Sequence, residues 1–327
     1  MAAGAVTPAI TTSVTPWWRN RRLIPWVVQG AAGLALLVVV AFLVGNLVRN
    51  LTNAGLLLSW SWLGNPAGFD VSETLLPFNA GLPYWRALAA GLVNTLRVVL
   101  VGLVGATLLG TLVGVAAFSS NGLLRRLARV YVELIRNIPL LLQLVFWYFV
   151  VFLALPGGRD AIQLPGVVLA KSGLFLLRPE LVNGVWQAPL RLTVEFGALL
   201  TGLVVYTAAF IAEVVRGGVA SVPSGQWEAA RSLGFSPLQT LQRIVLPQSL
   251  RVIVPGLNSQ YISLAKNSSL AVACGYTDLY SVAETTLNQT GRAVEVVLIL
   301  LGAYLVIDLL ISALMNGLNQ LVQIRER

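Results

Sequence analysis

The sequence predicts an all-α membrane protein with about six transmembrane helices. Of its 327 residues, 57% are hydrophobic and only 11% are charged, whereas soluble domains carry roughly 25% charged residues. Apolar runs of about twenty residues, the length that a helix needs to cross hydrocarbon, recur along the chain. The expected spans are residues 26–48, 92–118, 139–155, 192–211, 252–274 and 294–315.

The first expected span follows a cytoplasmic tail, residues 1–25, in which Trp17 and Trp18 stand beside arginines as interfacial anchors. Its apolar run is too long for a signal peptide and lacks a small-residue cleavage site, so we expect the helix to be retained. Residues 26–90 therefore comprise this helix and a first outer segment.

The second span contains Gly110 and Gly114, a pair of small residues on one helix face that favours close helix packing. The third span is short. It is followed by an outer segment, residues 156–190, which is rich in proline and glycine and unusually long for a connection between membrane helices.

The fifth span is polar, because Lys266 stands near its middle and is followed by Asn267, Ser268 and Ser269. These side chains compete for backbone hydrogen bonds, so we expect a helix break that presents polar groups to a ligand. The alternative is a buried structural network in which Lys266 packs against Glu213 or Asp308. Arg97 and Glu195 also lie in spans, where a charge is costly unless it is paired or reaches the headgroups.

Cations gather before the first span, between the second and third spans, in the segment 213–251 and at the end of the chain. The positive-inside rule then places both termini and residues 213–251 in the cytoplasm, which requires an even number of spans. The excess of 22 Lys and Arg over 13 Asp and Glu is accounted for by this topology and needs no nucleic acid.

The composition also excludes several kinds of site. There is no histidine and one cysteine, Cys274, so a Cys/His metal centre, a histidine base and an intramolecular disulfide are all ruled out. Neither of the two lysines, Lys171 and Lys266, follows a glycine. The sequence therefore has no Walker A motif, and we expect no cofactor in this chain.

The segment before the fifth span reads EAARSLGFSPLQTLQRIVLP. Its spacing resembles the EAA loop of ABC-importer permeases, where a short cytoplasmic helix docks on the ATPase. The alternative is an ordinary amphipathic loop punctuated by glycine and proline. The residues that carry the resemblance, and that it implies are coupling residues, are Glu228, Ala229, Ala230, Gly234, Ile244, Leu246 and Pro247.

Further stretches in residues 91–327 resemble the polar and general L-amino-acid permeases of this family: GLVNTL, YVELIRNIPLLLQ, AAFIAEVVRGG and LAKNSSL. The resemblance implies a type I ABC-importer permease fold in the bacterial inner membrane and no catalysis in this chain. It also implies a homologous permease subunit as partner, and it favours a heterodimer over a homodimer. It also implies two copies of a cytoplasmic ATPase, which bind ATP and Mg, and a periplasmic amino-acid-binding protein.

On this reading Lys266, Asn267, Ser268, Ser269, Glu195 and Arg97 are candidates for the substrate path. The segment 156–190, with an exposed run at 174–177, is expected to contact the binding protein. A secondary transporter is the main rival, but it would need an internal repeat and more intramembrane acids. A membrane-embedded enzyme would need a nucleophile or a metal cluster that this composition does not supply.

Overall fold

The computed structural model describes residues 24–53, 55 and 58–323. The predicted tail, with Trp17, Trp18 and the arginines at 19, 21 and 22, lies outside the described residues, as do Arg325 and Arg327. The chain divides into two compact units, Met1–Ser59 and Trp60–Arg327. Each is described by itself below.

The described part of the first unit is one long helix, α1 (Ile24–Asn53), and none of its described residues is buried. Leucine, valine and phenylalanine cover all of its sides, with Leu37 and Phe42 each 66% exposed. A helix that is apolar all round is stable only where its surroundings are apolar. This unit therefore agrees with the predicted first span.

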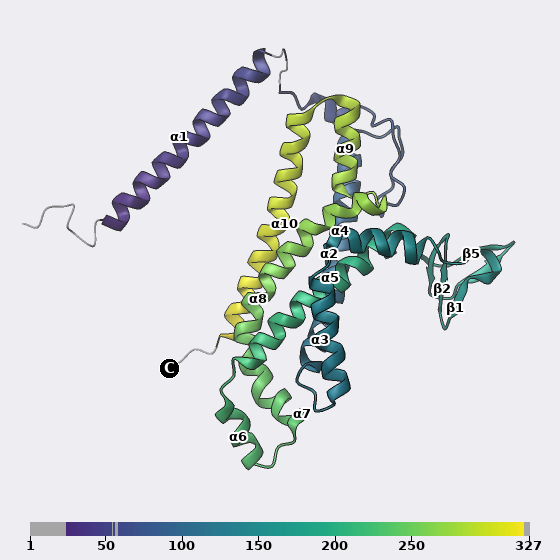
Figure 1. Ribbon diagram of the computed structural model, residues 1–327. Helices are drawn as coiled ribbons and strands as arrows, with labels where there is room; N and C mark the ends of the chain where they lie inside the picture. The colour runs from purple at the N-terminus through teal and green to yellow at the C-terminus, as the bar shows by residue number, and fades with distance from the viewer. Residues whose placement is uncertain (1–23, 54, 56–57, 324–327) are drawn as a thin grey trace, which may run out of the picture. The chain divides into compact units, whose positions relative to one another are not determined.

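The second unit is built around two long helices that pack closely, α2 (Tyr84–Ala116) and α5 (Val194–Ala220) (Figure 1). Gly110 and Gly114 of α2 face α5. A Cβ atom at Gly110 would lie 2.7 Å from the Ile211 side chain and 2.8 Å from the Ala208 carbonyl oxygen. The two glycines are thus where the backbones approach, as the sequence predicted.

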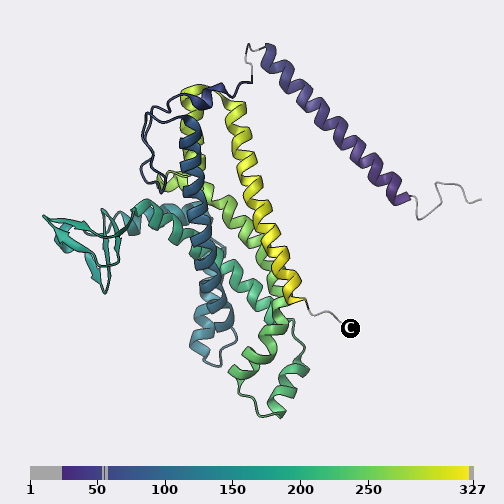
Figure 2. The same cartoon turned by 180° about the vertical axis from the view of Figure 1, so that it is seen from behind.

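A further helix, α8 (Leu246–Asn267), packs against α5, and α10 (Ala293–Val322) packs against α8 (Figure 2). A 3-10 helix, η6 (Ser268–Cys274), continues α8, and α9 (Leu279–Thr290) then packs against α2. By length and composition α1, α2, α5 and α10 can each cross a membrane. The fifth predicted span coincides with α8 and η6, which together are long enough to cross a membrane but carry many polar side chains.

The third predicted span differs most from the expected form. The chain forms α3 (Gly122–Arg136), then α4 (Leu140–Val145) and a π-helical stretch, η3 (Phe146–Phe152). The axes of α3 and of residues 140–152 differ by 105°. The predicted span, residues 139–155, therefore forms only the second part of a broken or re-entrant span, and the first part, α3, lies in what was expected to be the connection between the second and third spans. The break falls at Asn137–Pro139, because a proline disfavours the helical conformation of the residue before it.

The segment 156–190 is not a plain loop, since it folds into two small antiparallel sheets. One has the strand order β1-β2-β3-β6 and the other is the hairpin β4-β5. The expectation of an exposed leucine run there was wrong: Phe175 is 2% exposed and only Leu177, at 63%, is fully outward. The strands are β1 (Ile162–Leu164), β2 (Val167–Ala170), β3 (Gly173–Leu176), β4 (Glu180–Val182), β5 (Val185–Gln187) and β6 (Leu190–Leu192).

Residues 60–83 begin with a short 3-10 turn, η2 (Ser61–Gly64), and close over one end of α2 and α9. Trp62 and Tyr84 pack edge to face with ring centroids 5.5 Å apart. They join Leu88 and Val282 in one apolar cluster. The first outer segment is therefore an ordered cap on this end of the bundle.

Candidate functional site

The segment that follows α5 forms two short helices joined by a tight turn, α6 (Ser224–Ser232) and α7 (Pro237–Thr240). At the turn Gly234 has φ +81°, a left-handed conformation that suits glycine. Its N–H donates to the Arg231 carbonyl at 3.0 Å, and the Phe235 N–H donates to the Ala230 carbonyl at 3.1 Å. This geometry ends α6 and fixes the direction of α7.

One face of α6 packs against the rest of the protein and the other face is exposed. Ala230 is fully buried, and Trp227 packs on the apolar cluster formed by α5, α8 and α10. Gln248 of α8 donates to Gln226 at 3.2 Å. Glu228 and Ala229 are exposed. α6 is thus attached to the long helices through its buried face.

The second half of the segment is equally well defined. Ser236 and Gln239 form a capping box at the start of α7, and a π-helical turn, η5 (Leu241–Val245), leads into α8. Ile244 and Leu246 are half-buried. Pro247 stands where η5 passes into α8, and because the chain before it is already helical, its missing N–H removes one backbone donor at this junction.

The loop also exposes apolar side chains. Leu233 is 76% exposed and Leu238 is 60% exposed, one on each side of the turn. Large apolar groups at the tip of an otherwise polar loop are typical of a surface that binds another protein. The predicted coupling residues therefore separate into a buried group that anchors the loop and an outward group around the turn.

Lys266, in the last turn of α8, pairs with Asp308 of α10. The Nζ–Oδ2 distance is 3.3 Å, and the side chains are 60% and 18% exposed. The other carboxylate oxygen, Oδ1, is buried without a hydrogen-bond partner among the described residues. The Asp308 partner named by the structural alternative is thus present, but that alternative expected a buried network and the Lys266 side chain is more than half exposed.

The predicted break at Asn267, Ser268 and Ser269 takes a milder form than expected. The α-helix ends at Asn267, but the chain continues as the 3-10 helix η6. The Ser268 and Ser269 hydroxyls donate to the carbonyls of Ala265 and Lys266, at 2.7 and 2.8 Å. The backbone therefore changes its helix type without opening, and these hydroxyls are already satisfied.

The polar face of α8 extends toward α2. The Tyr261 and Thr107 hydroxyls lie 2.7 Å apart, and both residues line a shallow cavity of about 330 Å³ between the two helices. On the same helix Asn258 keeps a buried Oδ1 without a hydrogen-bond partner among the described residues. Polar groups of this kind suit a helix that faces protein or water rather than lipid.

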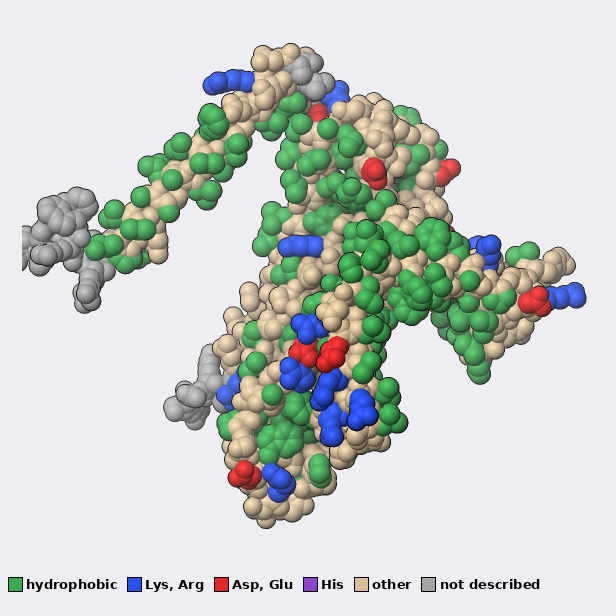
Figure 3. All heavy atoms as spheres, viewed as in Figure 1, with side chains coloured by type: hydrophobic (Ala, Val, Ile, Leu, Met, Phe, Trp, Pro, Cys, Tyr) green, Lys and Arg blue, Asp and Glu red, His purple; other side chains and the backbone are tan. Residues whose placement is uncertain are grey.

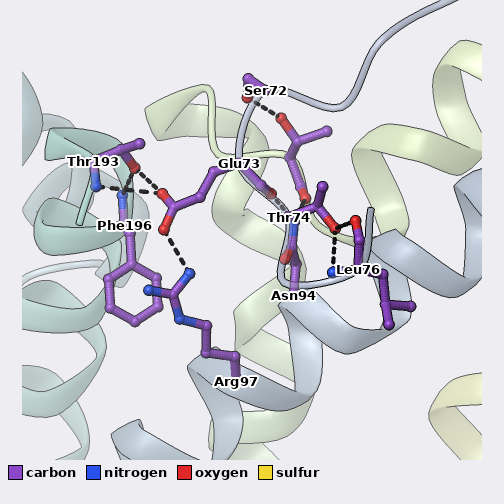
Figure 4. A network of polar contacts seen from close by, with 9 residues as sticks. Ser72, Glu73, Thr74, Leu76, Asn94, Arg97, Thr193 and Phe196 are labelled. Atoms are coloured by element: carbon purple, nitrogen blue, oxygen red, sulfur yellow. Dashed lines mark hydrogen bonds and ion pairs between the residues drawn. The ribbon is translucent and has the colours of Figure 1, made fainter. Parts of the chain in front are cut away.

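Arg97 is held in a separate network in the first half of α2 (Figure 4). Its Nη1 lies 2.5 Å from Oε1 of Glu73, and its guanidinium stacks 4.2 Å from the Phe196 ring centroid. The second oxygen of Glu73 accepts hydrogen bonds from the Thr193 backbone N–H, at 3.3 Å, and from the Thr193 hydroxyl. The charge of Arg97 is therefore already paired with Glu73, and the two side chains are only 13% and 14% exposed.

The same network ties residues 72–74 to the chain between η6 and α9. Asn94 donates from Nδ2 to the carbonyls of Glu73 and Thr277, at 2.5 and 2.8 Å. The Ser72 and Thr277 hydroxyls lie 2.7 Å apart. Glu73 was missed from the sequence, because no periodic pattern marks an acid in an irregular segment.

Glu195 does not meet Lys266 in the structure. It lies in the first turn of α5, where a carboxylate complements the helix dipole, and the Tyr148 hydroxyl donates to it at 3.4 Å. The six candidates for a substrate path therefore fall into three places: the α8–η6 junction, the Arg97–Glu73 network and the start of α5.

Comparison with known proteins assigns the chain to a family. Residues 106–324 match the family described as binding-protein-dependent transport system inner membrane component. The chain is 37% identical to a putative amino-acid ABC transporter permease, YhdX, of Escherichia coli K12, over 92% of this chain and 95% of that protein. It is 36% identical to the general L-amino acid transport system permease AapQ of Rhizobium johnstonii, over 86% and 87%.

The structural comparisons agree. The fold is similar to a crystal structure titled an amino acid ABC transporter with histidines, with a TM-score of 0.55, 25% identity, and coverage of 72% of this chain and 94% of that chain. The inward-facing MetNI methionine ABC transporter is similar at a TM-score of 0.55 and 21% identity, with coverage of 73% and 97%. The latter likeness concerns the fold alone.

Proposed function

The chain belongs to the family of binding-protein-dependent transport system inner membrane components, and from this premise we propose that it is the permease subunit of an ATP-driven importer of polar amino acids. The observation that carries the proposal is the α6–α7 loop, with an anchored face and an outward apolar tip. The names of the amino-acid permeases that share more than a third of its residues support the substrate class.

In this proposal the chain transmits force and hydrolyses nothing. ATP and Mg bind to two copies of a partner ATPase, whose closure moves α6. The motion passes through Ala230 and Trp227, and through the Gln226–Gln248 hydrogen bond, into α5 and α8. Rigid-body rocking of packed helices then opens the path to one side of the membrane at a time.

The most direct test is to isolate the full chain with its partners. A tagged chain purified from its own cells in mild detergent should bring with it an ATPase and a second permease subunit in stoichiometric amounts. Isolation of the folded chain without any ATPase, under conditions that retain the second subunit, would contradict the proposal.

We propose that the substrate passes the polar face of α8, within half of a path completed by a homologous subunit. A zwitterion at mid-membrane needs groups that balance both of its charges. Lys266 and Asp308 provide one cation and one anion at the α8–α10 contact, and more than half of the Lys266 side chain remains exposed. Neutralising either residue should therefore impair transport.

Lys266→Ala should lower uptake of polar amino acids, and Arg49→Ala, which removes an exposed cation from α1, should leave uptake unchanged. The single variant leaves the Asp308 carboxylate without its partner, which should cost about 1 to 3 kcal/mol of stability. The double variant Lys266→Ala/Asp308→Asn should recover that stability. If it also recovers uptake, the pair is structural and lies off the path.

We propose that the small sheets formed by residues 162–192 contact the periplasmic binding protein. They project to one side of the helices, with β3 packed on the start of α5 (Figure 1), and the β4-β5 hairpin exposes Val185 at 60% and Val182 at 40%. Replacing residues 180–187 by a short glycine–serine link should lower stimulation of ATPase activity by the binding protein more than it lowers basal activity. An equal loss of both activities would mark the hairpin as structural.

We propose that the end of the bundle bearing α6 and α7 faces the cytoplasm. Cys274 is fully buried, so Cys274→Ser provides a background for a single cysteine at position 231, which is exposed on α6. In intact spheroplasts an impermeant thiol reagent should not label this cysteine, and it should label a cysteine at position 178 on the outer sheet. The reverse pattern would overturn the topology.

A further inference from the structure

The amphipathic helix α3 carries three separate stripes of side chains. Ala128 and Val132 are buried against the bundle. A charged stripe follows at helical spacing, formed by Arg125, Arg129, Glu133 and Arg136. A third stripe is apolar and outward, with Leu123, Leu127, Val130 and Leu134 between 53% and 67% exposed.

The charged stripe borders a cavity of about 470 Å³ where α3 meets the last turns of α2 and α5. Residues at the ends of both long helices, Ala117 and Ala220, line it, so it lies at the end of the bundle from which the α6–α7 loop begins. Figure 3 shows cationic and acidic side chains gathered on one face over this part of the bundle.

The cations around the cavity differ in how well they are balanced. Glu213 accepts two hydrogen bonds from Arg216, at 2.9 and 3.0 Å, and Arg136 lies 3.7 Å from the same carboxylate. Arg125 and Arg129 form no ion pair among the described residues, although Arg125 donates to the Ser119 carbonyl at 3.0 Å. The cavity wall thus carries four arginines against two acids, Glu133 and Glu213, and Arg125 and Arg129, one turn apart, supply its excess positive charge.

Apolar side chains complete the cavity wall. Val113, Phe118 and Val132 line it together with the arginines, and Phe118 is 37% exposed. A small soluble anion would leave this surface uncovered. An anionic phospholipid matches both the cationic and the apolar part of the cavity wall, since a phosphate can accept hydrogen bonds from the arginines while acyl chains lie on apolar side chains.

We propose that this cavity binds the headgroup of an anionic phospholipid from the cytoplasmic leaflet, with Arg125 and Arg129 as the phosphate ligands. The apolar stripe of α3 then lies in the acyl region of the same leaflet, as in interfacial amphipathic helices. Lipid bound here holds α3 against α2 and α5, next to the loop that receives force. The inference does not depend on which amino acid is transported.

The test is native mass spectrometry of the purified full chain in detergent, titrated with dioleoyl-phosphatidylglycerol. Arg125→Gln/Arg129→Gln should weaken binding by about tenfold or more, because each arginine near an anionic lipid contributes roughly a factor of five. Arg251→Gln, which changes an exposed arginine on α8 that has no ion pair within the part of the chain that the structure describes, should have no effect. Arg125→Lys/Arg129→Lys should retain most of the binding.

Two competitors distinguish the source of the anion. Dioleoyl-phosphatidylcholine and inorganic phosphate should not displace the phosphatidylglycerol. Displacement by free phosphate, or by glutamate with the same dependence on Arg125 and Arg129, would assign the cavity to a soluble anion and overturn the proposal. Equal binding by the wild-type chain and the glutamine double variant, with both proteins folded, would also overturn it.

Discussion

Cells that carry Gly234→Pro should take up almost no labelled amino acid while retaining a normal amount of the protein in the membrane. Proline fixes φ near −65°, whereas position 234 has φ +81°. The substitution also removes the N–H that donates to the Arg231 carbonyl. The α6–α7 turn must therefore reorganise, and the loss of coupling should lower uptake by about 10- to 100-fold.

The matched control is Gly234→Asn, because asparagine tolerates the left-handed region and keeps the backbone N–H. Its uptake should stay within about twofold of the wild type, since nothing lies within 4 Å of a Cβ atom at this position. Glu228→Lys, which reverses a charge on the outward face of α6, should also uncouple uptake from ATP hydrolysis. Normal uptake by both Gly234→Pro and Glu228→Lys would show that the loop does not couple ATP hydrolysis to transport.

Gly110→Leu should abolish recovery of folded protein. A leucine Cβ atom would lie 2.7 Å from Ile211 and 2.8 Å from the Ala208 carbonyl oxygen, so α2 and α5 must separate. Overpacking of this kind costs about 3 kcal/mol or more when a backbone is the neighbour. The measurement is the yield of monodisperse chain in detergent and its thermal unfolding.

Gly302→Leu is the control for this variant, because Gly302 is an exposed glycine in α10 with nothing within 4 Å of its Cβ position. Both substitutions raise helix propensity by about the same amount. A difference between them therefore reports packing. Equal stability of the two variants would mean that α2 and α5 do not approach at Gly110.

Much of the fold could be predicted because lipid imposes a simple pattern on sequence. Each apolar run, at α1, α2, α5 and α10, specifies a single helix. The glycines of α2 specify a single contact between two helices. The α6–α7 turn was predictable for the same reason, since Gly234, Ser236 and Pro237 each act on their own backbone.

The parts that the sequence did not predict depend on pairs of distant residues. Nothing local in Glu73 indicates that it meets Arg97 and Thr193, and the polar run at Lys266 does not say whether Asp308 or a ligand balances the charge. The sheets in residues 162–192 were missed because strands of three or four residues are too short to show alternation.

The network around Glu73 also has a consequence for biosynthesis. Its contacts join residues 120 positions apart, Glu73 with Thr193, and 205 positions apart, Ser72 with Thr277. At about 5 to 20 residues per second, the ribosome needs roughly 10 to 40 seconds to produce Thr277 after Ser72. Glu73 is made before Arg97 and can pair with it at once, but the cap over α2 stays open until α5 and the segment before α9 have emerged. During this interval the ion pair lacks its hydrogen bonds from Thr193, and the nascent chain depends on the insertion machinery to shelter it.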